Sequence, residues 1–246
     1  MEKLEADIVI VGTGASGLFA ALHVPNDKKV LMLTKSDAEN SDSFLAQGGI
    51  CVLRDKNDFD SFMEDTMKAG HYENRKESVE IMINSSRDII NELIGYGVDF
   101  ATKDGKLDYT REGAHSKPRI LFHEDITGKE ITSTLLDVVR KLENVTIMEY
   151  VTMTDIIEKD NVCYGVLAKD ANNNEMSIEA GYTIFACGGI GGLYDHSTNY
   201  PHLTGDAIAI AIQHGIKLEN VDYVQIHPTT LYTKKKGRAF LISESV

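Results

Sequence analysis

Six residues near the amino terminus have the types and the spacing of a phosphate-binding turn. They follow an apolar run over 7–11 and precede a run of small apolar residues over 18–22, which predicts a strand, a tight turn and a helix. In such a GxGxxG unit the glycines allow the turn, a close approach to a pyrophosphate, and tight helix–strand packing. Amides at the helix start then bind the phosphates. We predict a dinucleotide-binding turn formed by Gly12, Thr13, Gly14, Ala15, Ser16 and Gly17.

The second predicted strand, over 30–34, argues against a nicotinamide cofactor. NAD-binding units normally end this strand in an acidic residue that binds the ribose hydroxyls. Here the strand is followed by Lys35 and Ser36, and the first acid, Asp37, comes later. A nicotinamide dehydrogenase is therefore a disfavoured alternative, which tight NAD binding would support.

Two further glycine-rich segments favour a flavin. Residues 46–50 read Ala-Gln-Gly-Gly-Ile, and a predicted strand over 182–186 runs into Gly188-Gly189. Because glycine has no Cβ, such main chain can lie directly against an isoalloxazine ring. Each segment alone could be an ordinary turn, but their order after a nucleotide-binding turn indicates FAD.

The remaining pattern predicts an α/β fold: a Rossmann-like FAD-binding domain with a parallel sheet and an inserted antiparallel β-meander. The helix over 74–96 has Asn74 as a candidate N-cap and Gly97 where a left-handed residue ends a helix. Further helices are predicted over 58–69, 128–142 and 204–214, parallel strands over 7–11, 30–34, 146–148 and 182–186, and the meander over 150–157, 162–169 and 175–178.

Composition narrows the possible partners. Of the 246 residues, 42% are apolar and 26% charged, which is typical of a globular protein, and the net charge of −13 argues against nucleic acid and anionic membranes. No apolar run approaches the ~20 residues of a membrane span, and we expect a cytoplasmic protein without a signal peptide. Cys51, Cys163 and Cys187 are too widely spaced to suggest a zinc site or a disulfide framework, so no metal is predicted.

The chain resembles the flavoprotein family that contains L-aspartate oxidases and the flavoprotein subunits of succinate dehydrogenase and fumarate reductase. The resemblance covers all 246 residues and implies an FAD-binding domain that stops before the family's capping domain. The segments that carry it are Val11–Gly17, Ala46–Ile50, Thr110–Ser116, Ala186–Gly189, Thr204–Ala211 and Val224–Thr229.

The resemblance implies that FAD is bound without a covalent bond. Succinate dehydrogenase flavoproteins carry the flavin on a histidine four residues before the alanine of this AQGG segment, where the chain has Asp42. Lys35 matches a residue beside the adenosine half of FAD, and Asp206 matches an acid that contacts FAD. The other residues expected at the cofactor are Ser43, Phe44, Leu45, Ala46, Gln47, Gly48, Gly49, Val151, Ala186, Gly188 and Gly189.

Two residues are expected at the substrate. Glu112, in a segment similar to the TREGGHS segment of L-aspartate oxidases, could pair with the α-ammonium that distinguishes aspartate from succinate. His227 matches a family histidine that helps to hold a substrate carboxylate. Arg119 matches a family arginine that we interpret as structural. The chain departs from the family pattern at Ala114 and Ala207, which replace glycines, and at Tyr200, which is inserted between Asn199 and Pro201.

The implied activity is oxidation of L-aspartate to iminoaspartate: a hydride passes from Cα to flavin N5 as the amine loses a proton, and the reduced flavin then returns its electrons to oxygen or fumarate. The product would pass to quinolinate synthase in NAD biosynthesis. The alternatives are a soluble fumarate reductase-like enzyme and an FAD-binding chain without catalysis. Family members are longer, and residues 1–246 are expected to form an incomplete FAD-binding domain. It lacks the capping domain, the catalytic arginine, a second substrate-binding arginine, the carboxyl-terminal flavin-binding segment and the carboxyl-terminal helical domain. We therefore expect the isolated chain to be inactive.

Overall fold

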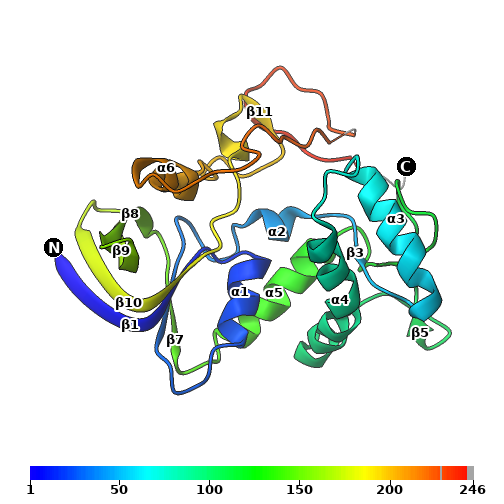
Figure 1. Cartoon of the computed structure of the whole chain (residues 1–246), viewed down its shortest axis with the longest axis horizontal. Helices are drawn as coiled ribbons and strands as arrows, with labels where there is room; N and C mark the ends of the chain where they lie inside the picture. Colours follow the sequence, from blue (N-terminus) through cyan, green and yellow to red (C-terminus); the bar gives the residue numbers. More distant parts are fainter. Residues whose placement is uncertain (228, 243–246) are drawn as a thin grey trace. The chain divides into compact units, whose positions relative to one another are not determined.

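The structure is a computed structural model that describes residues 1–227 and 229–242. Pro228 of the predicted Val224–Thr229 motif and residues 243–246 lie outside the described residues. The elements, labelled where room allows in Figure 1, are β1 (Glu2–Val11), α1 (Ala15–Leu22), β2 (Val30–Leu33), α2 (Asp42–Leu45), β3 (Ile50–Cys51), η1 (Lys56–Asp58), α3 (Phe59–Ala69), α4 (Lys76–Tyr96), β4 (Thr102–Lys103), β5 (Lys106–Leu107), β6 (Ile120–Leu121), α5 (Thr127–Val139), β7 (Val145–Met148), β8 (Thr152–Lys159), β9 (Val162–Lys169), β10 (Glu175–Phe185), η2 (Gly191–Leu193), β11 (His196–Ser197), α6 (Asp206–Gln213) and β12 (Gly237–Arg238).

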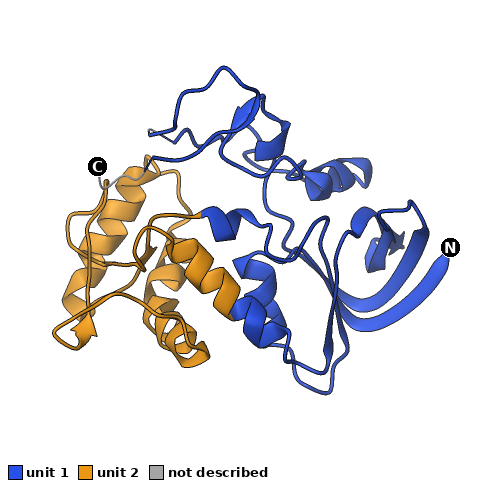
Figure 2. Ribbon diagram, turned by 180° about the vertical axis from the view of Figure 1, so that it is seen from behind, with its two compact units in different colours: residues 1–45, 135–242 blue, residues 46–134, 243–246 orange. Residues whose placement is uncertain are grey.

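The chain folds as two compact units, which Figure 2 shows in different colours. The first unit comprises residues 1–45 and 135–242, and the second comprises residues 46–134 of the described chain. One unit therefore contains both the amino-terminal strand and the late strands, while the other is a single continuous segment. That the two form one cofactor-binding domain stays a prediction.

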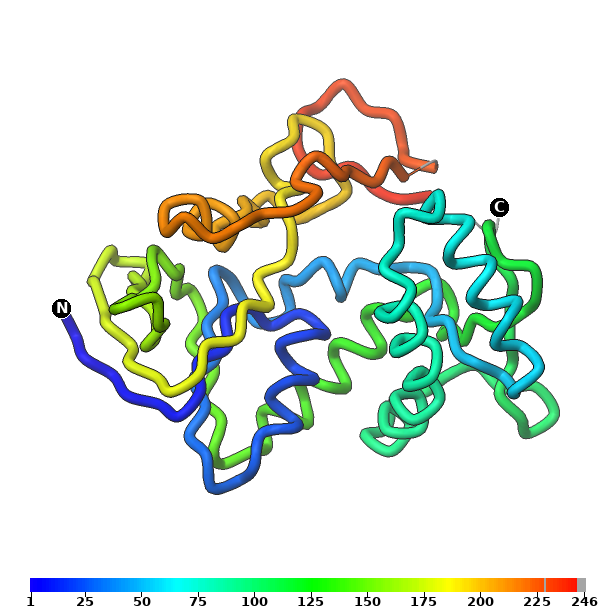
Figure 3. The backbone as a smooth tube through the Cα atoms, in the orientation of Figure 1, coloured from blue at the N-terminus to red at the C-terminus, as the bar shows by residue number. Residues whose placement is uncertain are grey.

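A six-stranded sheet forms the centre of the first unit, in the order β7-β2-β1-β10-β9-β8. The pairs among β7, β2, β1 and β10 are parallel, and β9 and β8 continue the sheet in antiparallel pairing. Figure 3 shows β1 and β10 running side by side although they are far apart in sequence. The predicted fold class, a parallel α/β sheet with antiparallel strands, is confirmed.

The antiparallel strands are joined to the parallel sheet differently from the prediction. The strands expected over 175–178 and 182–186 are a single strand, β10, which pairs with β1 from Glu2 to Val11. Gly181 lies between the two predicted strands, and a Cβ there would lie 3.3 Å from the carbonyl oxygen of Asp7. The glycine therefore lets the two main chains lie close, and the meander extends one edge of the sheet.

Both faces of the parallel strands are covered. Val9 and Ile10 point to opposite faces of β1 and are both fully buried, as is usual for parallel strands between two layers. Leu18 and Ala21 of α1 are also fully buried. Because β1, β2 and β10 run in the same direction, their carboxyl ends lie at one edge of the sheet, and the residues that follow them meet there.

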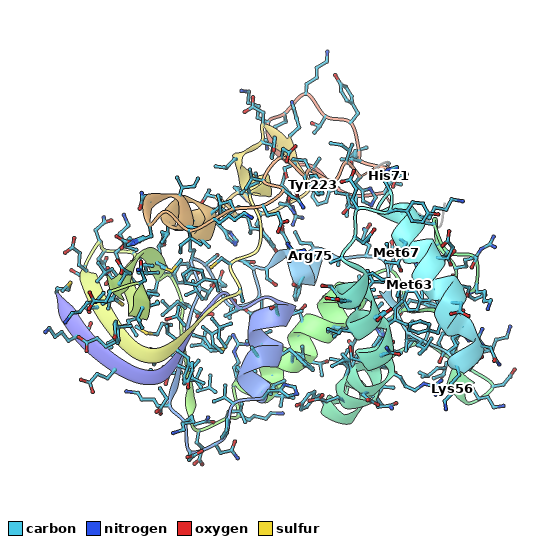
Figure 4. The ribbon with its side chains drawn as sticks, in the orientation of Figure 1. Lys56, Met63, Met67, His71, Arg75 and Tyr223 are labelled. Carbon is cyan, nitrogen blue, oxygen red and sulfur yellow. The ribbon has the colours of Figure 1, made fainter. Side chains whose placement is uncertain are left out.

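In the second unit α3 and α4 pack against each other through Phe62, Val79 and Ile83, and Met63 and Met67 point from α3 toward α4 (Figure 4). The predicted left-handed end of α4 is confirmed at the following glycine, which has φ +106°. None of the described helices, including the 21-residue α4, is long and apolar enough to cross a membrane.

The predicted N-cap of α4 was wrong. Arg75 occupies that position, and the helix begins one residue later. Asn74 instead packs against Gly70, where an added Cβ would lie only 2.1 Å from Asn74 Oδ1. Its side chain therefore belongs to the turn between α3 and α4.

Candidate functional site

A cavity of about 440 Å³ lies in the first unit at the edge where β1, β2 and β10 end. The last residues of these strands, Val11, Leu33 and Phe185, all form part of its wall. Ligands of open α/β sheets usually bind at the carboxyl ends of parallel strands. Of the residues predicted at a cofactor, the wall contains Gly12, Thr13, Gly14, Ser16, Lys35, Asp42, Ser43, Val151, Ala186, Gly188 and Asp206.

Other predicted residues support this wall or lie elsewhere in the described structure. Ala15 and Gly17 lie in α1, which follows the turn. Phe44 and Leu45 follow Ser43 in α2. Gly189 follows the wall residue Gly188. The remaining predicted residues, Ala46, Gln47, Gly48 and Gly49, belong to the second unit.

Glycine is required at two positions where β1 turns into α1. Gly12 has φ +115°, and a Cβ on it would lie 2.2 Å from the carbonyl oxygen of Ala186. A Cβ on Gly17 would lie 2.1 Å from the carbonyl oxygen of Gly12, so α1 approaches β1 this closely only with glycine. The GxGxxG turn and the end of β10, two of the three glycine-rich segments, therefore contact each other.

The start of α1 has the features of an anion site. The first amides of a helix have no carbonyl partner within it, and the helix dipole adds positive partial charge there. Ala15 donates its backbone N–H to Ser43 Oγ at 3.0 Å. A Cβ on Gly14 would lie 3.1 Å from the same oxygen. Ser43 therefore covers the helix start, where a phosphate group binds in this type of unit.

Lys35 and Asp206 meet in the wall of this cavity. Lys35 Nζ lies 2.7 Å from Asp206 Oδ2 and donates a second hydrogen bond to Thr204 Oγ1 at 2.8 Å. Thr204 in turn donates to Asp206 Oδ1 at 2.7 Å. The side chains of Lys35 and Asp206 are 24% and 29% exposed, so a ligand can reach them. This arrangement brings together two residues that the sequence resemblance assigns to one cofactor.

In the second unit Glu112 lies beside the glycines of the Ala46–Gly49 segment. A Cβ on Gly48 would lie 3.3 Å from Glu112 Oε2, and a Cβ on Gly49 would lie 2.2 Å from the side chain of Ile120. Gly48 and Gly49 are exposed, whereas Glu112 is half-buried. The exposed main chain of Gly48 and the carboxylate of Glu112 are therefore neighbours. That this segment and the GxGxxG turn bind the same ligand stays a prediction.

A fully buried arginine, Arg119, holds the loop that carries Glu112. It donates to the two carboxylate oxygens of Asp58 at 2.9 and 3.1 Å, and it donates a further hydrogen bond to Asp65. Asp65 also accepts hydrogen bonds from the backbone N–H and the hydroxyl of Ser116, at 2.8 and 2.7 Å. The end of the loop is thus tied to α3, which agrees with a structural interpretation of Arg119.

Both aspartates are charged at neutral pH because of these contacts. Burial opposes ionisation of Asp58, but hydrogen bonds from Arg119 and Ser61 and the charge of Arg119 outweigh it and lower the pKa to about 2. Burial also opposes ionisation of Asp65, and hydrogen bonds from Ser116 and Arg119 lower its pKa. The cluster is therefore a satisfied network of buried charges.

His115 and Cys51 continue this network without forming a nucleophile. Arg119 donates to His115 Nδ1 at 3.2 Å, which places the proton of the neutral ring on Nε2, 3.4 Å from Cys51 Sγ. Burial and the charge of Arg119 lower the pKa of His115. Burial and the charge of Glu112 raise the pKa of Cys51 to about 11. Since thiolates are the reactive form, Cys51 is an inert thiol here.

His227 lies in an irregular segment rather than at the end of a strand. Thr229 donates its backbone N–H to His227 Nδ1 at 3.3 Å. The neutral ring therefore carries its proton on Nε2, which is a hydrogen-bond donor suited to a carboxylate. His227 belongs to the first unit and Glu112 to the second, so their joint action on one substrate stays a prediction.

Sequence reasoning missed the partners of these residues. Asp58 and Asp65 are seven positions apart on a predicted helix, a spacing that places them on one face, but only the fold shows that Arg119 lies against that face. Thr204 was noted as part of a motif, and the hydrogen bond that it accepts from Lys35 was not predicted. Asn199 was noted as a neighbour of the inserted Tyr200, and nothing in the sequence pairs it with Asp42, 157 residues earlier.

Comparison with known proteins supports the assignment of the cavity. The chain is 44% identical to an L-aspartate oxidase of Clostridium perfringens over 245 residues and 46% identical to one of Clostridium acetobutylicum over 246 residues. In each case the alignment covers 99% of this chain and 56% of the relative, so the chain spans little more than half the length of these curated proteins. The resemblance found in the sequence motifs is confirmed.

A solved structure agrees with this result. A quinol fumarate reductase chain of E. coli superposes with a TM-score of 0.91 at 26% sequence identity, covering 99% of this chain and 42% of that chain. The sequence model of the FAD binding domain family matches residues 7–246. The glycines of the turn, the helix start at the cavity wall and the basic Lys35 in the same wall fit such a cofactor. The chain therefore belongs to the FAD binding domain family of flavoproteins, and its cofactor is FAD.

Proposed function

We propose that the protein to which this chain belongs is an L-aspartate oxidase, an FAD-dependent oxidoreductase that converts L-aspartate to iminoaspartate in the first step of de novo NAD biosynthesis. The observation that carries the proposal is the approach of Glu112 to Gly48, because it places a carboxylate against main chain that the resemblance assigns to the flavin. The names of the relatives with 44–46% identity support the same activity.

In this proposal the first unit holds FAD without a covalent bond. Gly14, Ser43 and the first amides of α1 would hold the diphosphate. Lys35 and Asp206 would contact FAD in the same cavity. Asp42 occupies the position of the family's flavin-linked histidine, and its carboxylate binds protein donors instead. When bound, FAD supplies the acceptor for the hydride, which carries both electrons of the oxidation.

The protein's own residues supply recognition of the substrate. Glu112 pairs with the α-ammonium of L-aspartate in a charge-assisted hydrogen bond. His227 donates from Nε2 to one of the two substrate carboxylates. Together they distinguish an amino dicarboxylate from succinate, since Glu112 has no partner on a substrate without an amine.

Several finer assignments belong to the same proposal. Oxygen or fumarate takes the electrons, and iminoaspartate passes to quinolinate synthase. A cytoplasmic location and the inactivity of the 246 residues alone remain predictions. A fumarate reductase-like enzyme is the second candidate, and the superposition on the E. coli chain favours it. An FAD-binding chain without catalysis is the third candidate.

Substitution of Glu112 by glutamine separates the first two candidates. In the complete gene product, Glu112→Gln should lower kcat/KM for L-aspartate by a factor of about 10 to 100, the loss expected for a hydrogen bond to a charged group. Fumarate reduction should change much less, because fumarate carries no ammonium. Steady-state rates with both substrates measure the difference.

The matched control is Glu77→Gln, which removes an exposed carboxylate from α4 in the same unit. It should leave both activities unchanged. Equal losses of aspartate and fumarate activity in Glu112→Gln would contradict the proposed role of Glu112 and favour the fumarate reductase.

A further inference from the structure

Asp42 lies in the wall of the FAD cavity and binds a second segment of the chain, which continues into the same wall. It is the first residue of α2, and its Oδ1 accepts the backbone N–H of Tyr200 at 2.9 Å. Its Oδ2 accepts a hydrogen bond from the side-chain amide of Asn199. All three residues belong to the first unit. We call this set of contacts, Asp42 with Asn199 and Tyr200, the latch.

The segment that the latch holds is itself part of the cavity. His202, Leu203, Thr204 and Gly205 line it together with residues 40–43. Tyr200 contacts two of these residues directly, so its position affects theirs. The Tyr200 ring stacks on His202 with 5.2 Å between ring centroids, and its carbonyl accepts the backbone N–H of Leu203 at 3.1 Å. Release of Tyr200 would therefore shift the wall.

Both carboxylate oxygens of Asp42 bind protein donors. Burial raises the pKa of Asp42, while hydrogen bonds from Tyr200 and Asn199 and the charges of His202 and Arg238 oppose this effect. A carboxylate is also a poor direct partner for a diphosphate, because both are negative. The contribution of Asp42 to FAD binding must therefore pass through the loop that it holds.

We propose that Asp42 is a positioning residue for FAD: the latch fixes the loop 199–205 against α2 and so keeps the cavity wall in its binding shape. Tyr200, which the sequence inserts between Asn199 and Pro201, provides the backbone donor for this contact. The inference rests on FAD as the cofactor of this cavity and does not depend on the substrate.

The first measurement is the affinity of the complete gene product for FAD, followed by quenching of flavin fluorescence. If the latch raises the population of the closed loop, its loss lowers the apparent affinity by the same factor. We expect Asp42→Ala to weaken FAD binding roughly tenfold, as losing hydrogen bonds to a charged group implies. Asp42→Asn, which keeps an acceptor for Tyr200, should give a smaller loss.

The double variant tests whether Asp42 acts through the loop. Asn199→Ala should also weaken binding, and adding it to Asp42→Ala should cause no further loss, because the contact is already broken. The control Asp195→Ala removes an exposed carboxylate that pairs with Lys236 near the same loop, and it should leave FAD affinity unchanged. The latch would be overturned if the two single losses of FAD affinity multiplied in the double variant, or if Asn199→Ala bound FAD as tightly as the wild type.

Chymotrypsin cleavage after Leu203 in the absence of FAD gives an independent readout, because Leu203 lies in the latched loop and is not followed by proline. The cleavage rate should rise severalfold in Asp42→Ala and stay at the wild-type rate in Asp195→Ala. Equal rates in all three proteins would overturn the latch even if FAD binds normally. A wild-type complete gene product that takes up no FAD would instead contradict the cofactor assignment, and the proteolysis would still decide whether the loop is latched.

Discussion

Replacement of Arg119 by methionine should lower the free energy of unfolding by about 3–5 kcal/mol. The substitution leaves the buried carboxylate of Asp58 and the partly buried carboxylate of Asp65 without their main charge partner. A loss of this size is a large part of the stability of a typical domain, which is about 5–15 kcal/mol. Urea unfolding followed by circular dichroism measures it, with Arg87→Met on the exposed face of α4 as the control.

The pH dependence of stability checks the cause of that loss. With a pKa of about 2 in the folded chain, against ~3.9 when unfolded, Asp58 contributes stability that is fully present above about pH 4 and is lost as the pH falls toward 2. The contribution at neutral pH is about 2–3 kcal/mol. The difference between wild type and Arg119→Met should therefore shrink in acid. A difference below about 1 kcal/mol at pH 7, in the range of surface pairs, would contradict the account.

Gly12→Ala should lower the affinity for FAD by a factor of about 100 or more. The new Cβ would stand 2.2 Å from the carbonyl oxygen of Ala186, at a residue with φ +115°. Strained backbone of this kind costs about 1–3 kcal/mol before the collision is counted. The turn must therefore move away from β10, and the phosphate-binding amides move with it. FAD titration followed by flavin fluorescence measures the loss.

The control for this substitution is Gly95→Ala, also a glycine-to-alanine change. Gly95 lies in the exposed part of α4, and a Cβ on it would meet no atom within 4 Å. Alanine should stabilise the helix there by about 0.5–1 kcal/mol and leave FAD binding unchanged. Normal FAD affinity in Gly12→Ala would show that this turn does not hold the cofactor.

Local patterns made much of the cofactor cavity predictable. The GxGxxG turn, Lys35 and Asp206 each lie directly beside an apolar strand or an amphipathic helix that the sequence shows clearly. Parallel pairing of β1 with β2 and β10 then brings the strand ends together, as the rules for open α/β sheets require. The cavity therefore follows from elements that can be recognised one at a time.

Other features depend on contacts that no local pattern contains. Two strands were predicted where β10 is continuous, because its pairing with β1 along Glu2–Val11 is not visible in the local pattern. The contacts of Arg119 with Asp58 and of Asp42 with Asn199 join residues 61 and 157 positions apart. From the sequence alone, charged and polar side chains of this kind are expected to be exposed to solvent. Their burial can be recognised only when the fold shows which residues they pair with.

Substrate choice by the complete gene product is the central claim, and the flavin reports on it directly. The oxidised protein is mixed anaerobically with L-aspartate or with succinate, and the absorbance of oxidised flavin is followed. We expect L-aspartate to bleach the flavin band rapidly and succinate to leave it nearly unchanged. Bleaching by succinate with no response to L-aspartate would contradict the proposed oxidase and the role given to Glu112.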